Sequence, residues 1–342
     1  MKKIQNNKKG ILSKFFVKIC RLFGYEIIDQ SDFSVPTLGK DLNDNLSIPG
    51  KKSITVPLGE IKITRNIKSF HVIVKTCTSV NLVTQNKSRI FEKNKSEYTF
   101  KTINSLINSL KYVAKTIQKL PIKITIIDHN SQKNDLKLIE NKLKNSGINF
   151  KILNLDLKEF SEKIKTLDKN NLDIEKNMKS TMSSIYKSFL LAKEDDNDLI
   201  YFVEDDYIHE RESLIEMLLT YEKLSSLFKN EIFLCPVDYP YLYKSHSKSA
   251  IFLGHKRHWR TVNESLLTFM TSKKVIEENY NSLEKMGIEW VDPWEKPLHD
   301  IYNSNPCLSP IPSLAVHCAN INSVFGVSPF VDLKKLWEKN KD

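Results

Sequence analysis

The feature that most constrains the fold of this chain is a run of five apolar residues that ends in three consecutive carboxylates. Residues 199–203 (LIYFV) show no alternation of apolar and polar side chains, which is typical of a strand buried on both faces in a parallel sheet. Glu204, Asp205 and Asp206 follow at once. Ligands of open α/β sheets bind beyond the carboxyl ends of strands, where clustered carboxylates suit a divalent cation shared with substrate phosphates. A solvated acidic turn is the alternative, but two hydrophobic residues follow the carboxylates in place of turn residues.

The elements around this strand alternate between strands and helices. The periodicity predicts strands over residues 70–76, 122–127, 150–155, 199–203 and 232–236, and helices over residues 100–120, 135–145, 181–192 and 212–228. This alternation is typical of a doubly wound sheet with right-handed crossovers. We therefore expect an α/β domain over residues 67–331, with a mostly parallel sheet flanked by helices. Residues 332–342 are expected to be a C-terminal tail.

Composition argues against several other protein classes. The 342 residues are enough for a large core. The five cysteines are scattered without a C-x-x-C pair, which indicates neither a disulfide framework nor a zinc site and favours a reducing compartment, the cytoplasm. The net charge of +11 does not make nucleic acid the expected partner, because only six of the 52 basic residues are arginine and no base-stacking motif accompanies them.

The N-terminal segment carries more than half of the net charge. Residues 1–28 contain seven basic residues and one acidic residue, and over residues 11–23 the apolar side chains fall on one helical face. Charges interrupt the apolar run too often for a membrane span. A basic amphipathic helix of this kind fits an anionic membrane surface, and we would then expect a peripheral protein on the inner face of the membrane. A helix packed on the protein's own core, or on a partner, is the alternative. Residues 29–66 are expected to be a connector with one hairpin near residues 54–64.

The second strand ends in D-H-N-S-Q-K-N-D, residues 128–135. A carboxylate at this position can accept hydrogen bonds from a base or ribose while the following helix N-terminus faces phosphate. Alone, the same residues are only a good helix start, with Asp128 or Asn134 as the cap. Together with the V-E-D-D motif about 76 residues later, they make the chain resemble the nucleotide-sugar glycosyltransferases of the GT-A fold, especially the family 2-like members.

The resemblance implies a hexosyltransferase-type enzyme that uses Mn²⁺ or Mg²⁺. It implies that Asp128 contacts the nucleobase of the donor, with Thr76 and Ser131 beside it, and that Asp206 holds the cation on the donor diphosphate. The usual Asp-x-Asp of the family is Glu-Asp-Asp here. Which of Glu204 and Asp205 faces the donor sugar therefore stays open.

A third group of candidate residues lies in G-I-E-W-V-D-P-W-E-K-P-L-H-D, residues 287–300. Asp292 and Glu295 match a helix start, with a capping residue and a capping-box glutamate. The resemblance adds that inverting enzymes of this fold place their general base late in the domain beside aromatic residues. Such a base removes the proton of an acceptor hydroxyl, which is otherwise a poor nucleophile. Asp292 is the first candidate for the base and Glu295 the second. Trp290 and Trp294 either stack on sugar rings or are buried tryptophans.

Three more residues are candidates for binding the donor or the cation. Arg257 and Arg260 lie in the densest basic and aromatic cluster, and the guanidinium fork suits a diphosphate; an exposed loop is the alternative. His317 follows a short apolar strand. The resemblance makes His317 an additional metal ligand, whereas a core histidine is the plainer alternative.

The predicted function is metal-dependent transfer of a sugar from a nucleotide diphosphate to a glycan or lipid-linked acceptor, with inversion. This would suit polysaccharide biosynthesis. A nucleotidyltransferase is one alternative, which the absence of glycine from residues 75–81 disfavours. A non-catalytic, membrane-associated binding protein is the other.

Overall fold

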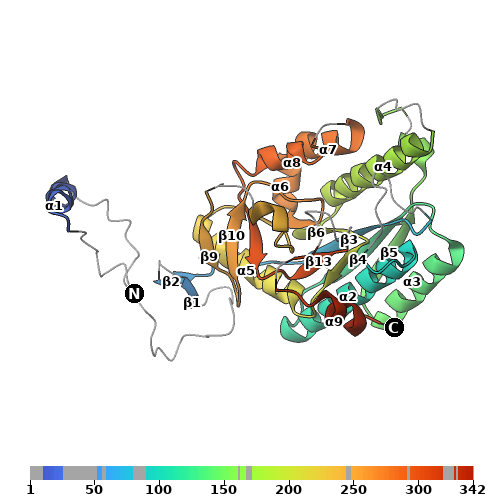
Figure 1. Ribbon diagram of the computed structural model, residues 1–342, viewed down its shortest axis with the longest axis horizontal. Coiled ribbons are helices and arrows are strands. Elements are labelled where there is room, and N and C mark those ends of the chain that lie inside the picture. The colour runs from blue at the N-terminus through green and yellow to red at the C-terminus, as the bar shows by residue number, and fades with distance from the viewer. Residues whose placement is uncertain are drawn as a thin grey trace.

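The computed structural model describes residues 11–25, 52–55, 59–79, 90–160, 162–166, 172–243, 248–290, 293–318, 327–328 and 330–341. Its centre is a nine-stranded sheet with the order β5-β4-β3-β6-β11-β8-β12-β10-β9 (Figure 1). The first four strands in this order are mutually parallel, and only β11 and β10 run against them. The expected fold class, a mostly parallel α/β sheet flanked by helices, is confirmed.

The parallel half of the sheet is the part that the sequence predicts most closely. It contains β3 (Phe70–Thr76), β4 (Ile122–Asp128), β5 (Asn149–Asn154) and β6 (Leu199–Glu204), each within one residue of its predicted bounds. Strand β6 is buried along its length until Glu204, and its side chains alternate between two apolar cores. The register pairs Thr76 with Asp128 and Lys75 with Glu204, so the polar strand ends meet at one edge.

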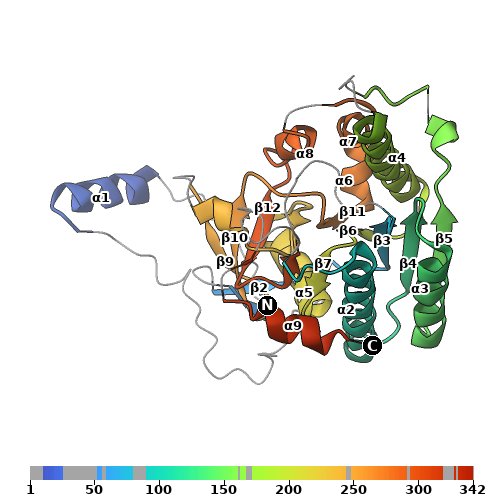
Figure 2. The ribbon, with the colours of Figure 1, turned by 45° about the vertical axis from the view of Figure 1, so that its right-hand side comes forward.

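Helices cover both faces of the sheet (Figures 1 and 2). One face carries α2 (Lys95–Thr116), α3 (Lys133–Ser146) and α5 (Ser213–Phe228), and the other carries α4 (Leu172–Glu194), α6 (Lys273–Glu278), α7 (Tyr280–Ile288) and α8 (Lys296–Ile301). Helix α2 begins five residues before its predicted start and α4 nine residues before. In both cases the added turns are largely polar, so apolar periodicity does not reveal them.

The second half of the sheet is mixed and its strands are short. It contains β8 (Phe233–Leu234), β9 (Ile251–Leu253), β10 (His258–Val262), β11 (Phe269–Ser272) and β12 (Cys307–Ile311). Strand β8 is shorter than predicted, and Pro236, which has no N–H to donate, follows it closely. Short 3₁₀ helices, η2 (Leu157–Phe160) and η3 (Pro240–Tyr243), lie in the connections. Strands β7 (Tyr207–His209) and β13 (Ala315–His317) form a separate antiparallel pair, hereafter the β7–β13 ribbon.

An N-terminal helix and a hairpin are present, and the hairpin lies two residues earlier than its predicted range. Helix α1 (Ile11–Leu22) stands apart from the sheet in both views (Figures 1 and 2). Its apolar side chains are exposed, for example Ile11 at 87% and Phe15 at 63%, so this face does not pack on the protein's own core. Strands β1 (Lys52–Thr55) and β2 (Gly59–Lys62) form the hairpin. No helix in the described ranges combines the length and apolar character needed to cross a membrane.

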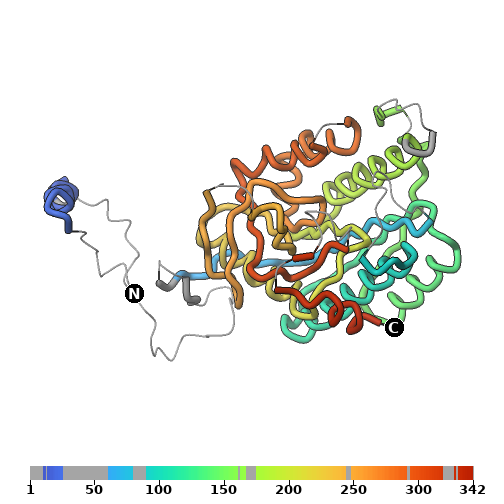
Figure 3. The backbone as a smooth tube through the Cα atoms, in the orientation of Figure 1, coloured from blue at the N-terminus to red at the C-terminus, as the bar shows by residue number. Residues whose placement is uncertain are grey.

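The C-terminal segment, predicted as a tail, contains a packed helix. Helix α9 (Leu333–Lys339) lies beside α2 at the end of the chain (Figure 3). Trp337 is buried, with its ring centroid 5.0 Å from that of Tyr98 and 4.3 Å from that of Phe91. A helix of seven residues is marginal by itself, so packing against α2 and the β7–β13 ribbon stabilises it.

Candidate active site

Three carboxylates follow one another at the end of strand β6, and Asp205 is the buried one of the three. Its side chain pairs with the ammonium group of Lys95 and accepts hydrogen bonds from the Thr99 hydroxyl (2.9 Å) and the Cys77 N–H (3.2 Å). These contacts tie the first turn of α2 and the loop after β3 to the end of β6. Glu204 and Asp206, both partly exposed, are therefore the two carboxylates of the motif that can face a ligand.

Asp206 lies opposite His317 because of the register of the β7–β13 ribbon. The ribbon pairs His317 with Tyr207, stacks the two rings with centroids 4.5 Å apart, and brings the imidazole Nε2 to 3.5 Å from Asp206 Oδ1. Burial opposes the charged imidazole, but Asp206 and Glu204 outweigh it and raise the pKa of His317. The chain thus joins two predicted metal ligands that are 111 positions apart.

Lys75 extends toward Glu204 from the neighbouring strand. Its Nζ lies 3.3 Å from Glu204 Oε1, and both side chains are partly exposed. The Glu204 N–H donates to the Thr268 hydroxyl (3.1 Å), which fixes the end of β6 against the start of β11. The sequence reasoning did not single out Lys75, although a charged residue near the end of a buried strand is a usable signal.

Glu295, the second candidate for the general base, precedes helix α8 and is partly exposed. Burial raises the pKa of Glu295 to about 7; Glu204 contributes to the rise, while Lys75 and His317 partly oppose it. The charges of Glu204, Lys75 and His317 therefore act on the Glu295 carboxyl. A carboxyl that titrates near neutral pH suits a general base. The first candidate, Asp292, lies outside the described residues.

Two tryptophans adjoin Glu295. The ring centroids of Trp290 and Trp294 are 4.9 Å apart, and the Trp294 indole N–H donates to the Met286 carbonyl (2.8 Å). Both side chains are partly exposed. Trp294 therefore holds α7 through its indole N–H, and both rings still present aromatic surface to solvent.

We refer to five of these polar residues together as the edge cluster: Lys75, Glu204, Asp206, Glu295 and His317.

The predicted donor-binding residues Thr76, Asp128 and Ser131 do lie together. Asp128 is 1% exposed, and its carboxylate accepts hydrogen bonds from the Thr76 hydroxyl (2.6 Å) and from the N–H (3.2 Å) and hydroxyl of Ser131. The Ser131 hydroxyl in turn accepts from the Thr78 N–H (3.0 Å). Asp128 thus links the loops after β3 and β4, and both of its carboxylate oxygens accept hydrogen bonds from other residues of the protein.

Arg257 and Arg260 are both engaged by carboxylates of the protein. Arg257 donates to the Ser313 carbonyl (2.6 Å) and pairs with Glu210, and these two partners adjoin the end of the β7–β13 ribbon opposite His317. Arg260 pairs with the buried Asp238 at 2.7 Å. Both guanidinium groups are neutralised by carboxylates of the protein, which does not favour the predicted contact with a donor diphosphate.

Asp206 and His317 are the residues of the edge cluster that could hold a cation shared with a substrate. Within the described ranges, no group of three or more His, Cys, Asp and Glu side chains is arranged to hold a metal ion alone. Mg²⁺ in nucleotide sites typically binds through one or two carboxylates plus substrate phosphates and waters. Asp206 supplies one carboxylate and His317 one imidazole, and both are partly exposed. The remaining ligand positions would come from a diphosphate and water.

Comparisons with known proteins give only distant likenesses. No family model matches the chain, and no curated protein matches it significantly. Among solved structures, S. aureus TarS residues 1–349 gives a TM-score of 0.40 at 13% identity, covering 70% of this chain and 57% of that chain. The galactosyltransferase LgtC, with donor and acceptor sugar analogues, gives 0.34 at 10% identity, covering 70% and 72%. A UDP-glucose pyrophosphorylase with UDP-glucose gives 0.36 at 8% identity, covering 75% and 95%. At these values the comparisons do not decide the function.

Proposed function

We propose that this protein is a metal-dependent glycosyltransferase that moves a sugar from a nucleotide diphosphate donor to a glycan or lipid-linked acceptor. The observation that carries the proposal is the edge cluster. It contains a carboxylate–imidazole pair and a lysine–glutamate pair beyond the end of β6, and their charges act on the Glu295 carboxyl, whose pKa is near neutral. This is the edge at which open α/β sheets bind their ligands.

Asp206 and His317 would hold Mn²⁺ or Mg²⁺ against the donor diphosphate. The cation supplies stabilisation of the negative charge that develops on the leaving group. Lys75, 3.3 Å from Glu204, is a partly exposed cation of the protein at this edge and would add to that stabilisation. Glu204 would orient the donor sugar, because Asp205 is occupied by Lys95 and Thr99.

Glu295 would act as the general base. With its pKa raised to about 7, its carboxylate form is available at neutral pH and is basic enough to accept the proton of an acceptor hydroxyl in the transition state. The hydroxyl oxygen then attacks the anomeric carbon as the bond to the diphosphate breaks, which gives inversion. The partly exposed Trp290 and Trp294 would offer an apolar surface to the acceptor sugar.

The donor nucleoside would bind at the loops after β3 and β4. Asp128 organises these loops through Thr76 and Ser131, so its expected contribution is to the shape of the nucleoside site. A direct contact between Asp128 and the base would require the carboxylate to exchange one of these partners. The exposed helix α1 would hold the enzyme peripherally at the cytoplasmic face of a membrane, near a lipid-linked acceptor.

Two alternative functions can be distinguished from the proposed one by experiment. A nucleotidyltransferase would need a phosphate-binding loop after β3; the described residues 75–79 contain no glycine, which disfavours it. A non-catalytic binding protein would keep the fold without turning over a donor. Pyrophosphate formation from a nucleoside triphosphate and a sugar phosphate would identify the first, and no turnover of any donor the second.

Mn²⁺-dependent hydrolysis of a panel of nucleotide sugars tests the proposal. We expect Asp206→Asn to lower hydrolysis roughly a hundredfold or more, as for loss of a main electrostatic contact to the leaving group. Asp196→Asn is the matched control, because Asp196 is exposed at the opposite edge of the sheet. Unchanged hydrolysis in Asp206→Asn would place the metal site elsewhere. Isothermal titration of UDP and GDP, with and without Mn²⁺, separates loss of binding from loss of turnover.

A further inference from the structure

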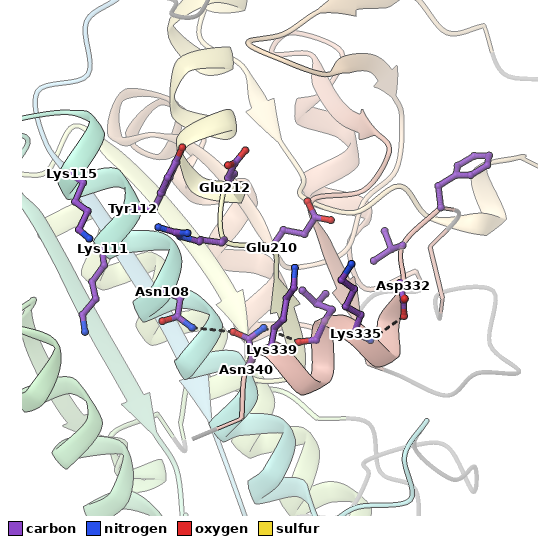
Figure 4. A pocket seen from close by; sticks show the side chains of 14 residues that line it. Asn108, Lys111, Tyr112, Lys115, Glu210, Glu212, Asp332, Lys335, Lys339 and Asn340 are labelled. Atoms are coloured by element: carbon purple, nitrogen blue, oxygen red, sulfur yellow. Dashed lines mark hydrogen bonds between the residues drawn. The ribbon is translucent and has the colours of Figure 1, made fainter.

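A large open groove lies between helices α2 and α9, away from the edge cluster. Its volume is about 910 Å³. One wall is the C-terminal half of α2, the other is α9, and residues 210–212 between β7 and α5 close the end (Figure 4). This α2–α9 groove exists only because the C-terminal helix docks through Trp337 on Tyr98.

The α2–α9 groove carries an excess of positive charge. Its lining contains five cationic side chains, Lys111, Lys115, Arg211, Lys335 and Lys339, against the three carboxylates Glu210, Glu212 and Asp332. In the described part of the chain, none of the four lysines forms a side-chain ion pair. Two of the three carboxylates are already engaged: Glu210 pairs with Arg257, and Asp332 accepts the Lys335 N–H as the cap of α9.

Side-chain hydrogen bonds and a cation–π contact hold the floor and one end of the groove in place. Asn340 is 5% exposed; its side-chain oxygen accepts from Asn108 (3.3 Å) and its backbone carbonyl from Asn104 (3.1 Å). These contacts fix α9 to α2. At the end of the groove the Arg211 guanidinium lies 5.1 Å from the centroid of the Tyr112 ring. The groove therefore presents lysines on two walls (Figure 4). The Arg211 guanidinium and the Tyr112 ring add a cation and an aromatic surface to it.

The groove is separate from the edge cluster but lies on the same helix. Thr99 of α2 contacts Asp205 beside the edge cluster, and Lys111 lies three and a third turns further along α2. At 1.5 Å per residue this corresponds to about 18 Å. A small donor or acceptor at the edge cluster would not reach the groove, whereas a polymer could occupy both.

We propose that the α2–α9 groove binds an anionic glycan polymer, which makes the acceptor, or the growing product, an acidic polysaccharide chain. This inference rests on the proposed glycosyltransferase function. Opposed rows of lysines match a chain that carries a carboxylate or phosphate on each repeat. A bilayer surface is flat and does not fit between two helices. A nucleic acid would be favoured by several aromatic platforms for its bases, but Tyr112 is covered by Arg211.

Fluorescence anisotropy with labelled oligogalacturonates of increasing length tests the proposal on the full chain, without donor or metal. We expect affinity to rise with length and to fall with salt, because the contacts are screened charges. The variants Lys335→Glu/Lys339→Glu and Lys111→Glu/Lys115→Glu alter the two walls separately. Each is expected to weaken binding roughly tenfold or more. Lys334→Glu/Lys137→Glu is the matched control, because both lysines are exposed and neither lines the groove, Lys334 lying on α9 itself and Lys137 on α3.

Several outcomes would overturn the proposal. They are no binding by the wild type, equal loss of affinity in groove and control variants, and tighter groove-dependent binding of oligo-dT or of anionic vesicles. Circular dichroism shows that the variants remain folded. Asp206→Asn separates the two proposals: it is expected to bind the oligogalacturonate as the wild type does while losing transfer. Groove-dependent binding in a protein that turns over no nucleotide sugar would contradict the proposed function alone.

Discussion

Asp205 and Asp206 are neighbours in the chain, but their side chains meet different partners. Asp205 is closed in by Lys95, Thr99 and Cys77, whereas Asp206 faces His317 across the ribbon. Chemistry alone makes the two carboxylates equivalent candidates for a cation. Burial and partners distinguish them, because a carboxylate whose oxygens are already paired gains little from a ligand and loses much if uncovered.

The pH dependence of transfer tests the role of Glu295. A base works in its deprotonated form, so the kcat/KM of the wild type should rise with pH and level off above about 7, the pKa to which burial raises this carboxyl. Glu295→Gln should lose this rise and lower kcat/KM roughly a hundredfold or more. The readout is initial rates from pH 5.5 to 8.5 at saturating Mn²⁺.

A plateau that begins near pH 4.5, or a Gln variant with an unchanged profile, would remove Glu295 from the role of base. Asp292→Asn is the companion variant. Loss of the pH profile in that variant with retention in Glu295→Gln would return the role to the first candidate from the sequence.

At the scale of elements, the short terminal helices α1 and α9 differ in whether their apolar side chains are buried. Both carry apolar residues at helical spacing, but α9 buries Leu336 and Trp337 whereas α1 leaves Phe15 and Phe16 exposed at 63% and 60%. A set of large apolar side chains exposed on one helix marks an interaction site. Lysines interspersed along the same helix favour an anionic bilayer as the surface that covers it.

Deletion of residues 1–28 should abolish sedimentation with vesicles that contain anionic lipid. The wild type should bind these vesicles and should be released by high salt, because part of the attraction is electrostatic. Phe15→Ser/Phe16→Ser keeps every charge and should weaken binding at least tenfold through loss of apolar burial. Full binding by the truncated chain would rule out α1 as the membrane contact. Neither change should affect hydrolysis of the donor in solution.

At the scale of the whole molecule, an ion network fastens the connector to the amino edge of the sheet. Arg65 pairs with Asp198 (2.6 Å) and Glu231 (2.8 Å), and the Ile67 N–H donates to the buried Glu222 (2.8 Å). The network joins segments that are more than a hundred positions apart. It lies at the edge of the sheet opposite the edge cluster, because Asp198 precedes the first residue of β6.

Glu222 should make stability fall as pH rises. Burial raises its pKa from 4.5 to about 7, so the folded state binds more protons than the unfolded state between these values, and the free energy of unfolding decreases through that window. Glu222→Gln keeps a side-chain oxygen that accepts from the Ile67 N–H. It also removes the ionisation that lowers the free energy of unfolding as pH rises. The variant should gain up to about 3 kcal/mol relative to the wild type between pH 4.5 and pH 7.5.

Urea denaturation at several pH values measures this difference. Glu162→Gln is the control, because Glu162 is exposed and its substitution should leave the pH dependence of unfolding unchanged. A stability difference between wild type and Glu222→Gln that does not vary with pH would show that the carboxyl is already ionised in the folded protein.

The sequence by itself determined the parallel half of the sheet and the edge at which a site would form. The strand around residues 199–203 is buried on both faces, so every one of these residues is apolar. The carboxylates that follow mark the end of the strand. Only the tertiary structure decided which polar residues meet. It placed Lys75 beside Glu204 and His317 beside Asp206, paired Arg257 with Glu210, and buried Asp205 against Lys95. These contacts join residues that lie far apart in the chain, and local periodicity carries no information about such pairings because they depend on strand register and on helix docking.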